Sequence, residues 1–286
     1  MISGKTGLLA LIGHPVEHSL SPAMHNASFA AEGLDYVYVA LDVRPDDLPA
    51  AVRGAAALGF RGFNVTMPHK RAMISLVDEL DDAARVSGAV NTVVVEGPRL
   101  RGHNTDGGGM VLACREAGFE LSGRRVLLLG AGGAAAAVAL AFGGEGAGQL
   151  RVVNRSVQHA LDLRDKLRWA GLKAVEVYPY DALDEAARDA EVLVNATPLG
   201  MKDGDPLPMP SEHLDEGRIV CDAVYRPGRE TALVWEARRH GARVVTGERM
   251  LLYQGVLAQR LWTGREPNVE VMNGAIPFSA PHPSGA

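Results

Sequence analysis

The chain has 286 residues, enough for two average domains, and its proportions of 47% hydrophobic and 22% charged residues are typical of globular proteins. A formal net charge of -5 leaves no basic excess to attract nucleic acid or an acidic membrane. The two cysteines, Cys114 and Cys221, have no CxxC or histidine-rich neighbours, which argues against a zinc site or a disulfide framework.

The sequence also lacks the patterns of a targeted or membrane-anchored protein. Its beginning has no basic-then-apolar signal pattern, and no apolar run approaches the roughly 18 residues of a membrane span. We therefore expect a cytoplasmic protein without a membrane partner.

The first part of the chain alternates between strand-like and helical runs. The patterns predict strands at Leu8–Ile12, Tyr36–Ala40, Gly62–Thr66 and Ala89–Val95. They predict helices at Pro22–Gly33, Pro45–Leu58 and Lys70–Leu80, and a hairpin over Val93–His103 that turns at Gly97 and Pro98. This β-α-β order is typical of a mostly parallel sheet covered on both faces.

A second alternating series follows three consecutive glycines, Gly107–Gly109, which we expect to act as a hinge. Strands are predicted at Arg125–Leu129, Leu150–Asn154, Ala174–Val177, Val192–Ala196, Arg218–Ala223 and Arg243–Val245. An apolar-periodic helix is predicted at Met250–Trp262. The Pro/Gly/Ser-rich tail, Asn273–Ala286, is expected to be disordered.

The clearest local signal is an apolar strand that runs into glycines and then into a helix of small residues. Gly130 permits a tight turn, Gly132 lets the backbone approach a pyrophosphate, and Ala135 lets the helix pack closely on the strand. The exposed amides at such a helix start bind anions. A glycine-rich turn can serve packing alone, but the strand before it and the helix after it favour dinucleotide binding.

The end of the next strand indicates which dinucleotide is bound. An NAD enzyme usually has Asp or Glu there to accept a hydrogen bond from the ribose, but this chain has Asn154, Arg155 and Ser156. A guanidinium can bind a 2′-phosphate, which favours NADP. The alternative interpretation of Arg155 is a solvated surface arginine.

Polar residues also follow the strands of the first series. Ser19 and Ser21 precede a helix start and could bind a carboxylate, although Ser21 followed by Pro22 is also typical of a helix N-cap. Lys70 and Asp106 follow later strand-like runs, where open α/β sheets bind their ligands. On their own, Lys70 would be a solvated helix-start residue and Asp106 an N-cap. With Asn64, Thr66, Asn91 and Thr92, they predict a site for a polyhydroxylated acid.

The histidines His14, His18 and His25 have no metal-like partner set, and we expect them to be structural or solvated.

In order along the chain, these motifs resemble those of the shikimate dehydrogenase family. The matching segments are HSLSPAMHN from His18, NVTMPHK from Asn64, GAVNT from Gly88, NTD from Asn104, GAGGAAAA from Gly130, NRS from Asn154, NATPLGM from Asn195, DAVYRP from Asp222 and GxxMLxxQ from Gly247 to Gln254. The resemblance covers the chain from about Leu9 to Trp262.

The resemblance implies an α/β protein with two domains and a cleft between them. A substrate-binding domain with an open sheet would comprise residues 1–106 and 248–272, and a Rossmann-type NADP-binding domain residues 107–247. Lys70 and Asp106 would be the catalytic pair, with Asp106 hydrogen-bonded to the lysine and to the substrate. The substrate contacts would be Ser19, Ser21, Asn64, Thr66, Asn91, Tyr225 and Gln254. The cofactor contacts would be Gly130, Ala131, Gly132, Gly133, Ala134, Asn154, Arg155, Ser156, Thr197 and Gly247.

The implied reaction is the reversible, NADPH-dependent reduction of 3-dehydroshikimate to shikimate in aromatic amino acid biosynthesis, by a monomer or homodimer with no metal. One departure from the family pattern is His159, at a position where NADP-dependent members often have a second basic residue. Three alternatives stay open: a quinate/shikimate or aminoshikimate dehydrogenase of the same family, a non-catalytic NADP-binding sensor, and a methylenetetrahydrofolate dehydrogenase. The last does not explain the SLSP and NTD segments.

Overall fold

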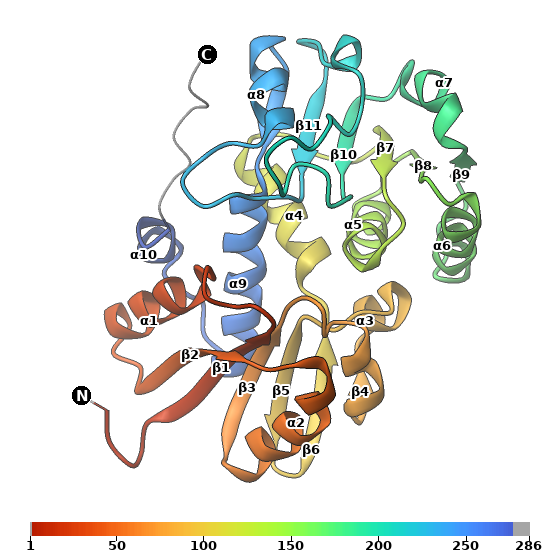
Figure 1. The fold of residues 1–286 in the computed structure, drawn as a ribbon. Helices are drawn as coiled ribbons and strands as arrows, with labels where there is room; N and C mark the ends of the chain where they lie inside the picture. Colours follow the sequence, from red (N-terminus) through yellow and green to blue (C-terminus); the bar gives the residue numbers. More distant parts are fainter. Residues whose placement is uncertain (1, 277–286) are drawn as a thin grey trace. The chain divides into compact units, whose positions relative to one another are not determined.

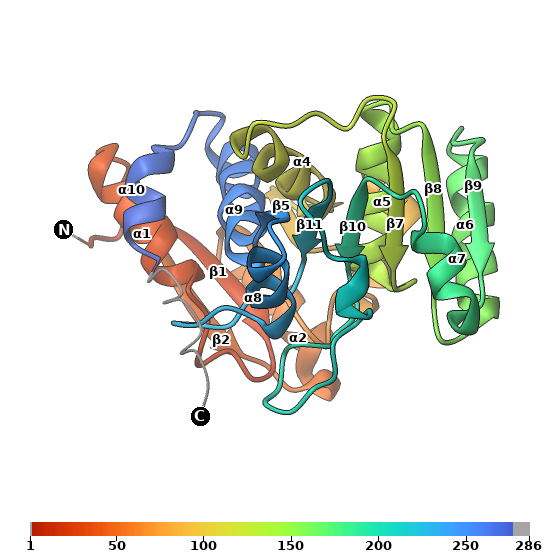
Figure 2. The same ribbon diagram turned by 90° about the horizontal axis from the view of Figure 1, so that it is seen from above.

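The computed structural model describes residues 2–276, whose elements are drawn in Figures 1 and 2. The described chain divides into two compact units. Unit 1 comprises the described residues up to Thr105 together with those from Leu252 onward, and unit 2 runs from Asp106 to Leu251. Each unit has its own six-stranded sheet with helices packed on it, which confirms the two-sheet α/β class. Within residues 2–276, none of the helices combines the length and the apolar character of a membrane span.

The sheet of unit 1 has the strand order β2-β1-β3-β5-β6-β4. Its strands are β1 (Gly7–Gly13), β2 (Tyr36–Asp42), β3 (Phe60–Val65), β4 (Glu79–Leu80), β5 (Thr92–Glu96) and β6 (Arg99–His103). β1 lies parallel to β2 and β3, whereas β5 is antiparallel to β3 and to β6. The predicted hairpin is confirmed as β5 and β6, and Gly97 takes a φ of 62° in its turn. The sheet is therefore parallel at one side and antiparallel where the hairpin enters it.

Helices cover both faces of this sheet because its central strands are apolar on both sides. The helices of unit 1 are α1 (Ser21–Ala31), α2 (Leu48–Ala57, after the 3-10 turn Pro45–Asp47), α3 (Asp82–Ser87), α10 (Val269–Gly274) and most of α9 (Gly247–Thr263), which starts in unit 2. Ile12 of β1 packs in one core with Val52 of α2. The next position back, Leu11, faces the other way and packs with Phe29 of α1 and Trp262 of α9.

The predicted helix at Lys70–Leu80 is wrong. Lys70 lies in a turn, Ala72–Leu76 forms a 3-10 helix, and Glu79–Leu80 forms strand β4, parallel to β6. The Asp78 carboxylate accepts a hydrogen bond from the Leu100 backbone N–H at 2.7 Å, which fixes this strand entry. Pairing with β6, distant in sequence, thus overrides the local helical pattern.

Helix α3 follows directly and was not predicted, although its boundaries have clear signals. Asp81 caps its start by accepting a hydrogen bond from the Ala84 backbone N–H at 2.7 Å, and Gly88 ends it with a φ of 64°. The predicted strand Ala89–Val95 consequently begins later, at Thr92.

The predicted disordered tail, Asn273–Ala286, is corrected at its beginning. Helix α10 includes Asn273, and Ile276 is only 5% exposed because it packs with Met24 of α1 and Leu252 of α9. Residues 277–286 lie outside the described part of the chain.

The sheet of unit 2 is entirely parallel, in the order β12-β11-β10-β7-β8-β9. Its strands are β7 (Arg125–Leu129), β8 (Gln149–Val153), β9 (Val175–Tyr178), β10 (Val192–Asn195), β11 (Ile219–Asp222) and β12 (Arg243–Val245). Counted from β7, this is the doubly wound order of dinucleotide-binding domains. The first strand β7 lies in the middle, and Figure 2 shows β8 and β9 on one side of it and β10 and β11 on the other.

The helices of unit 2 cover an apolar sheet. They are α4 (Asp106–Glu116), α5 (Gly133–Gly144), α6 (Val157–Trp169), α7 (Leu183–Ala187), α8 (Ala232–Arg239) and the start of α9, with 3-10 turns at Tyr180–Ala182 and Ser211–His213. Leu127 and Leu129 of β7 pack in one core with Leu183 of α7 and Leu233 of α8. Cys114 of α4 and Cys221 of β11 are buried and free, with their Sγ atoms 3.9 Å apart.

The three glycines after Asp106, predicted to be a hinge in a loosened segment, lie in a regular helix. They lie in the first turns of α4, where Gly107 and Gly109 are buried. A Cβ on Gly107 would overlap the main-chain carbonyl of Ala137 and lie 2.9 Å from the Cβ of Ala141, both on α5. Gly107 therefore serves the close packing of two helices.

Candidate active site

The strand order of unit 2 reverses between β7 and β10, and two predicted cofactor residues meet there. Open α/β sheets bind ligands at the carboxyl ends of strands at such a switch point. Gly130, directly after β7, has a φ of 110°, and a Cβ on it would lie 2.8 Å from the carbonyl oxygen of Ala196 and 3.3 Å from the backbone nitrogen of Thr197. Glycine is required there by the backbone angle and by the approach of the loop after β10.

Helix α5 starts beside this turn with its amide groups uncapped by a side chain. Gly132 is the N-cap residue and forms no side-chain cap bond, and the first turn contains no acidic residue. A Cβ on Gly132 would meet no atom within 4 Å, so the space in front of the helix start is open. Positively polarised N–H groups, open space and no competing carboxylate fit a pyrophosphate. Ala131, Gly133 and Ala134 are partly exposed along this turn.

Of the three residues after β8, Asn154 and Ser156 form local hydrogen bonds, and Arg155 is an exposed cation. The Asn154 side-chain amide donates to the Ser156 carbonyl at 2.9 Å, and the Ser156 hydroxyl caps α6 by accepting from the His159 backbone N–H. Arg155 is exposed and takes part in no ion pair among residues 2–276. Its guanidinium is therefore available to a phosphate.

The loop after β10 is held by Asn195 and Asp222, two buried residues that begin matching sequence segments but had no predicted role. Asn195 accepts hydrogen bonds from the Thr197 backbone N–H at 3.1 Å and from its hydroxyl at 2.7 Å. Asn195 also donates to Asp222 at 2.9 Å. Burial raises the pKa of Asp222 to about 6, while hydrogen bonds from Thr231, Val224 and Asn195 oppose that rise.

Tyr225 and Gly247 lie together in unit 2, in a small pocket. A Cβ on Gly247 would overlap the main chain of Val224 and lie 2.8 Å from the backbone nitrogen of Tyr225. Burial raises the pKa of the Tyr225 phenol. The pocket also contains Arg226, Thr231 and Glu248.

In unit 1, buried amide and hydroxyl side chains gather where β3 ends and β5 begins. The Asn64 side-chain amide donates to the Asn91 carbonyl at 3.1 Å and to the Thr92 hydroxyl at 3.0 Å. Asn91 accepts from the Thr105 backbone N–H at 2.9 Å, and its amide lies 3.4 Å from the Gln254 side-chain oxygen. Since β3 and β5 are antiparallel, the end of β3 lies beside the start of β5, which brings Asn64 close to Asn91. Gln254 of α9 reaches Asn91, so three predicted substrate contacts come together.

Ser21 is not the N-cap of α1. The helix begins at Ser21 itself, and the cap position is Leu20, which forms no side-chain cap bond. The Ser21 hydroxyl is instead hydrogen-bonded to the Tyr38 phenol, which in turn donates to the Asn64 side-chain oxygen at 2.7 Å. Burial, the larger effect, raises the pKa of Tyr38 well above its usual range, so the phenol keeps its proton.

Tyr38 was missed as a site residue because its alternating strand pattern only indicates a core position. Its contacts link two predicted substrate residues, Ser21 and Asn64. Its ring also stacks on His25, with centroids 4.6 Å apart. His25, expected to be structural or solvated, is fully buried, and its Nδ1 lies 3.1 Å from the Gln259 side-chain oxygen.

The remaining predicted residues have different surroundings. Ser19 is half-buried, and its hydroxyl oxygen accepts from the Ser21 backbone N–H at 3.2 Å, which leaves its proton for a ligand. Thr66 follows β3 and Lys70 lies in the next turn, both half-buried. Asp106 is 5% exposed and begins α4 in unit 2, directly after Thr105 in the chain. The structure thus places Lys70 and Asp106 in different units.

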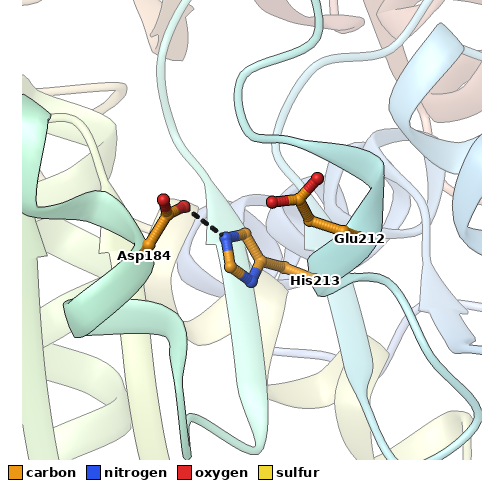
Figure 3. A group of neighbouring side chains, drawn as sticks. All are labelled: Asp184, Glu212 and His213. Atoms are coloured by element: carbon orange, nitrogen blue, oxygen red, sulfur yellow. Dashed lines mark hydrogen bonds and ion pairs between the residues drawn. The ribbon is translucent and has the colours of Figure 1, made fainter.

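One further group of polar side chains lies away from these residues in unit 2. Figure 3 shows Asp184, Glu212 and His213 side by side, with His213 Nε2 2.8 Å from Asp184 Oδ1. Their ligand atoms lie within 4.8 Å of one another, but both carboxylates are exposed, and such groups are common without an ion. The sequence predicts no metal site, and that stays a prediction.

Comparison with known families gives matches over most of the chain. The model of the shikimate dehydrogenase substrate binding domain matches residues 11–93. The model described as shikimate / quinate 5-dehydrogenase matches residues 112–199. The model of the shikimate 5′-dehydrogenase C-terminal domain matches residues 247–276.

Individual proteins are similar over almost the whole chain. A shikimate dehydrogenase (NADP(+)) of Rubrobacter xylanophilus is 63% identical, over 96% of this chain and 97% of that protein. A crystal structure of a shikimate dehydrogenase with NADP+ has a TM-score of 0.89 at 40% identity, over 96% of each chain. A shikimate 5-dehydrogenase of Thermus thermophilus, with NADP(H) and shikimate, has a TM-score of 0.85 at 39% identity, over 94% of this chain and 98% of that one.

Proposed function

The chain belongs to the shikimate dehydrogenase family, and we propose that it reduces 3-dehydroshikimate reversibly to shikimate with NADPH, on the route to aromatic amino acids. The observation that carries the proposal is the buried cluster of Asn64, Asn91, Thr105 and Gln254. Amide and hydroxyl groups fixed by one another suit a ligand with several hydroxyls, because each pairs with a hydroxyl as donor or acceptor.

When bound, NADPH would supply the hydride for the reduction, and NADP+ would accept it in the reverse direction. The amides at the start of α5 would hold its pyrophosphate, because Gly132 leaves them uncapped and open to an anion. Arg155 would bind the 2′-phosphate, since a guanidinium pairs with phosphate in a planar, bidentate manner. Thr197, anchored on Asn195, would line the switch point from the side of β10.

The substrate carboxylate would bind at Ser19 and Ser21. The Ser19 hydroxyl has its proton available, whereas the Ser21 proton is engaged with Tyr38 and has to turn to reach a ligand. Asn64 has both amide hydrogens in use, so it would accept a hydrogen bond from a substrate hydroxyl through its side-chain oxygen. Asn91, Thr66, Tyr225 and Gln254 complete the proposed substrate contacts.

Proton transfer is assigned to Lys70 and Asp106. During reduction the lysine ammonium donates a proton to the oxygen that becomes the hydroxyl, and during oxidation the neutral amine takes it back. Asp106, a buried carboxylate at the start of α4, would orient these groups and stabilise the ammonium.

Initial rates with shikimate and with quinate, each against NADP and NAD, test the proposal. A shikimate dehydrogenase should be most efficient with shikimate and NADP. Higher efficiency with quinate would favour a quinate/shikimate dehydrogenase, since one matching family model covers both activities. NADP binding without turnover of any substrate would favour a non-catalytic sensor.

The proposal also includes a cytoplasmic location and a monomeric or dimeric assembly. Cys114 and Cys221 are buried core residues of unit 2, as is common for cysteines of proteins in reducing compartments. Sedimentation of the purified chain, with and without NADP, would measure the assembly.

A further inference from the structure

Asp222 is a fully buried carboxylate with several hydrogen-bond donors and no assigned role. It is the last residue of β11, and the register of the parallel strands pairs it with Asn195, the last residue of β10. Its Oδ1 accepts from the Asn195 side-chain amide at 2.9 Å and from the Val224 backbone N–H at 3.0 Å. Its Oδ2 accepts from the Thr231 hydroxyl at 2.6 Å. All these partners donate, so the site suits the ionised acid.

The bond to Asn195 fixes which way that amide is turned. Because its Nδ2 faces Asp222 and the Leu199 carbonyl, its Oδ1 has to face the N–H and hydroxyl of Thr197. The neighbouring Ala196 carbonyl lies against Gly130. The Asp222 carboxylate therefore sets the position of the loop that faces the dinucleotide turn.

The bond to Val224 fixes a second segment. The carbonyl of Val224 and the backbone nitrogen of Tyr225 lie against Gly247, where no side chain would fit. The third bond, from Thr231, orients a hydroxyl that also caps α8 by accepting from the Val234 backbone N–H. Two of the three contacts thus lead along the main chain to residues proposed to bind cofactor or substrate, and the third leads to a helix cap.

We propose that Asp222 is a positioning residue for cofactor binding, which holds the Asn195–Leu199 loop and the Val224–Tyr225 segment in their binding geometry. The proposal rests on the assignment of the switch point of unit 2 as the NADP site. It predicts that Asp222 governs the affinity for NADP and leaves the chemical step, once NADP is bound, largely unchanged.

The test compares three variants by calorimetric titration with NADP and by steady-state rates. Asp222→Asn and Asn195→Ala should each raise the Kd for NADP by roughly ten- to 150-fold, the range for loss of one charge-assisted hydrogen bond. At saturating NADP, kcat should stay within about threefold of the wild type, since neither residue touches reacting atoms. A matched control, Thr231→Val, removes the third donor to the same carboxylate and keeps the size of the side chain in the pocket that contains Gly247; it should lower Tm and leave the Kd unchanged.

A double variant tests whether Asp222 acts through the loop. If it does, the Kd for NADP of the double variant Asp222→Asn with Thr197→Val should be about equal to the larger Kd of the two single variants. If the two residues act independently, the two increases in Kd should multiply. Asp222→Asn and Asn195→Ala that lower Tm but keep the wild-type Kd for NADP would overturn the proposal. If Asp222→Asn does not fold, Asn195→Ala decides the question. Titration with NADP needs no turnover, so a wild-type enzyme inactive on shikimate would refute the proposed function without deciding the role of Asp222.

Discussion

Gly107 of α4 lies against the main-chain carbonyl of Ala137 on α5, so closely that a Cβ on Gly107 would overlap it. The obstructing atoms are backbone and cannot swing aside. We expect Gly107→Ala to destabilise unit 2 by about 1–3 kcal/mol, the usual cost of overpacking. Urea unfolding of the purified variant measures this free energy.

A matched control for Gly107 lies on the partner helix. Gly144 is at the end of α5, and a Cβ on it would meet no atom within 4 Å. Gly144→Ala should keep or raise the free energy of unfolding, by up to about 1 kcal/mol, because alanine loses less backbone entropy in a helix. Equal stability of both variants would mean that Gly107 is not a packing position, and a hinge would again be the better interpretation.

Tyr38 should affect substrate binding although it is a core residue. Tyr38→Phe keeps the stacking on His25 and removes the hydrogen bond to Asn64, so the Asn64 amide is no longer fixed. We expect the KM for shikimate to rise by about tenfold. A tenfold change corresponds to about 1.4 kcal/mol of binding free energy, which lies within the roughly 1–3 kcal/mol that an unsatisfied buried polar group costs.

Ser19→Ala provides the comparison, because it removes a hydroxyl proposed to donate directly to the carboxylate. It should raise the KM for shikimate by roughly ten- to 150-fold, the range for loss of a charge-assisted hydrogen bond, and leave the KM for NADP unchanged. If Tyr38→Phe leaves the KM for shikimate unchanged while Ser19→Ala raises it, Tyr38 has only a packing role.

Lys70→Ala and Asp106→Asn should each lower kcat by at least about 100-fold, the lower end of general acid–base contributions. Lys70 is half-buried in a turn and contributes little to the core, and Asp106→Asn keeps the size of the side chain. Both variants should therefore fold and bind NADP with wild-type affinity in a titration. Near-wild-type turnover in either variant would remove that residue from the catalytic assignment.

The sequence predicted well what is decided within a few consecutive residues. The strand β7, the turn at Gly130 and the start of α5 form one local unit, and their pattern indicates both the structure and the anion site. The strands of unit 2 are also close to prediction, because strands buried on both faces are continuous apolar runs bounded by turn residues.

What the sequence did not predict depends on partners that are distant in the chain. β4 forms by pairing with β6, and Gly107 is explained only by the approach of α5. Tyr38 and Asp222 have the patterns of ordinary strand residues. Their roles appear only when Asn64 and Asn195 come within hydrogen-bonding distance.

His25 should make the protein less stable as the pH falls from about 6.5 toward 4. Burial lowers the pKa of His25 from 6.5 to about 4, against the opposing hydrogen bond with Gln259. Between these values the unfolded chain binds a proton that the folded chain does not, so stability present above pH 6.5 is lost on acidification. At pH 4.5 the loss is on the order of 2 kcal/mol.

His25→Phe removes this titration and keeps an aromatic ring against Tyr38. We expect the unfolding free energy of the wild type minus that of the variant to fall by that amount from pH 7.5 to pH 4.5. Urea titrations at both pH values measure it. Asp222 has the opposite sign, since its raised pKa costs stability as the pH rises through about 6, and both proteins share that effect. A difference that is independent of pH would show that the folded chain binds the proton on His25 as readily as the unfolded chain, so that burial does not lower its pKa.

Arg155 should determine the preference for NADP over NAD. It is exposed after β8, Asn154 and Ser156 offer no carboxylate to a ribose hydroxyl, and their side chains already have local hydrogen bonds. One charge-assisted pair with the 2′-phosphate is worth about 1.5–3 kcal/mol, or roughly ten- to 150-fold in kcat/KM. Arg155→Ala should lower kcat/KM for NADP by about that factor and leave the value for NAD unchanged. Arg164→Ala, which removes the same charge further along α6, is the control and should leave the preference intact. A wild-type enzyme that uses NAD as efficiently as NADP at pH 7 would show that Arg155 does not recognise the phosphate.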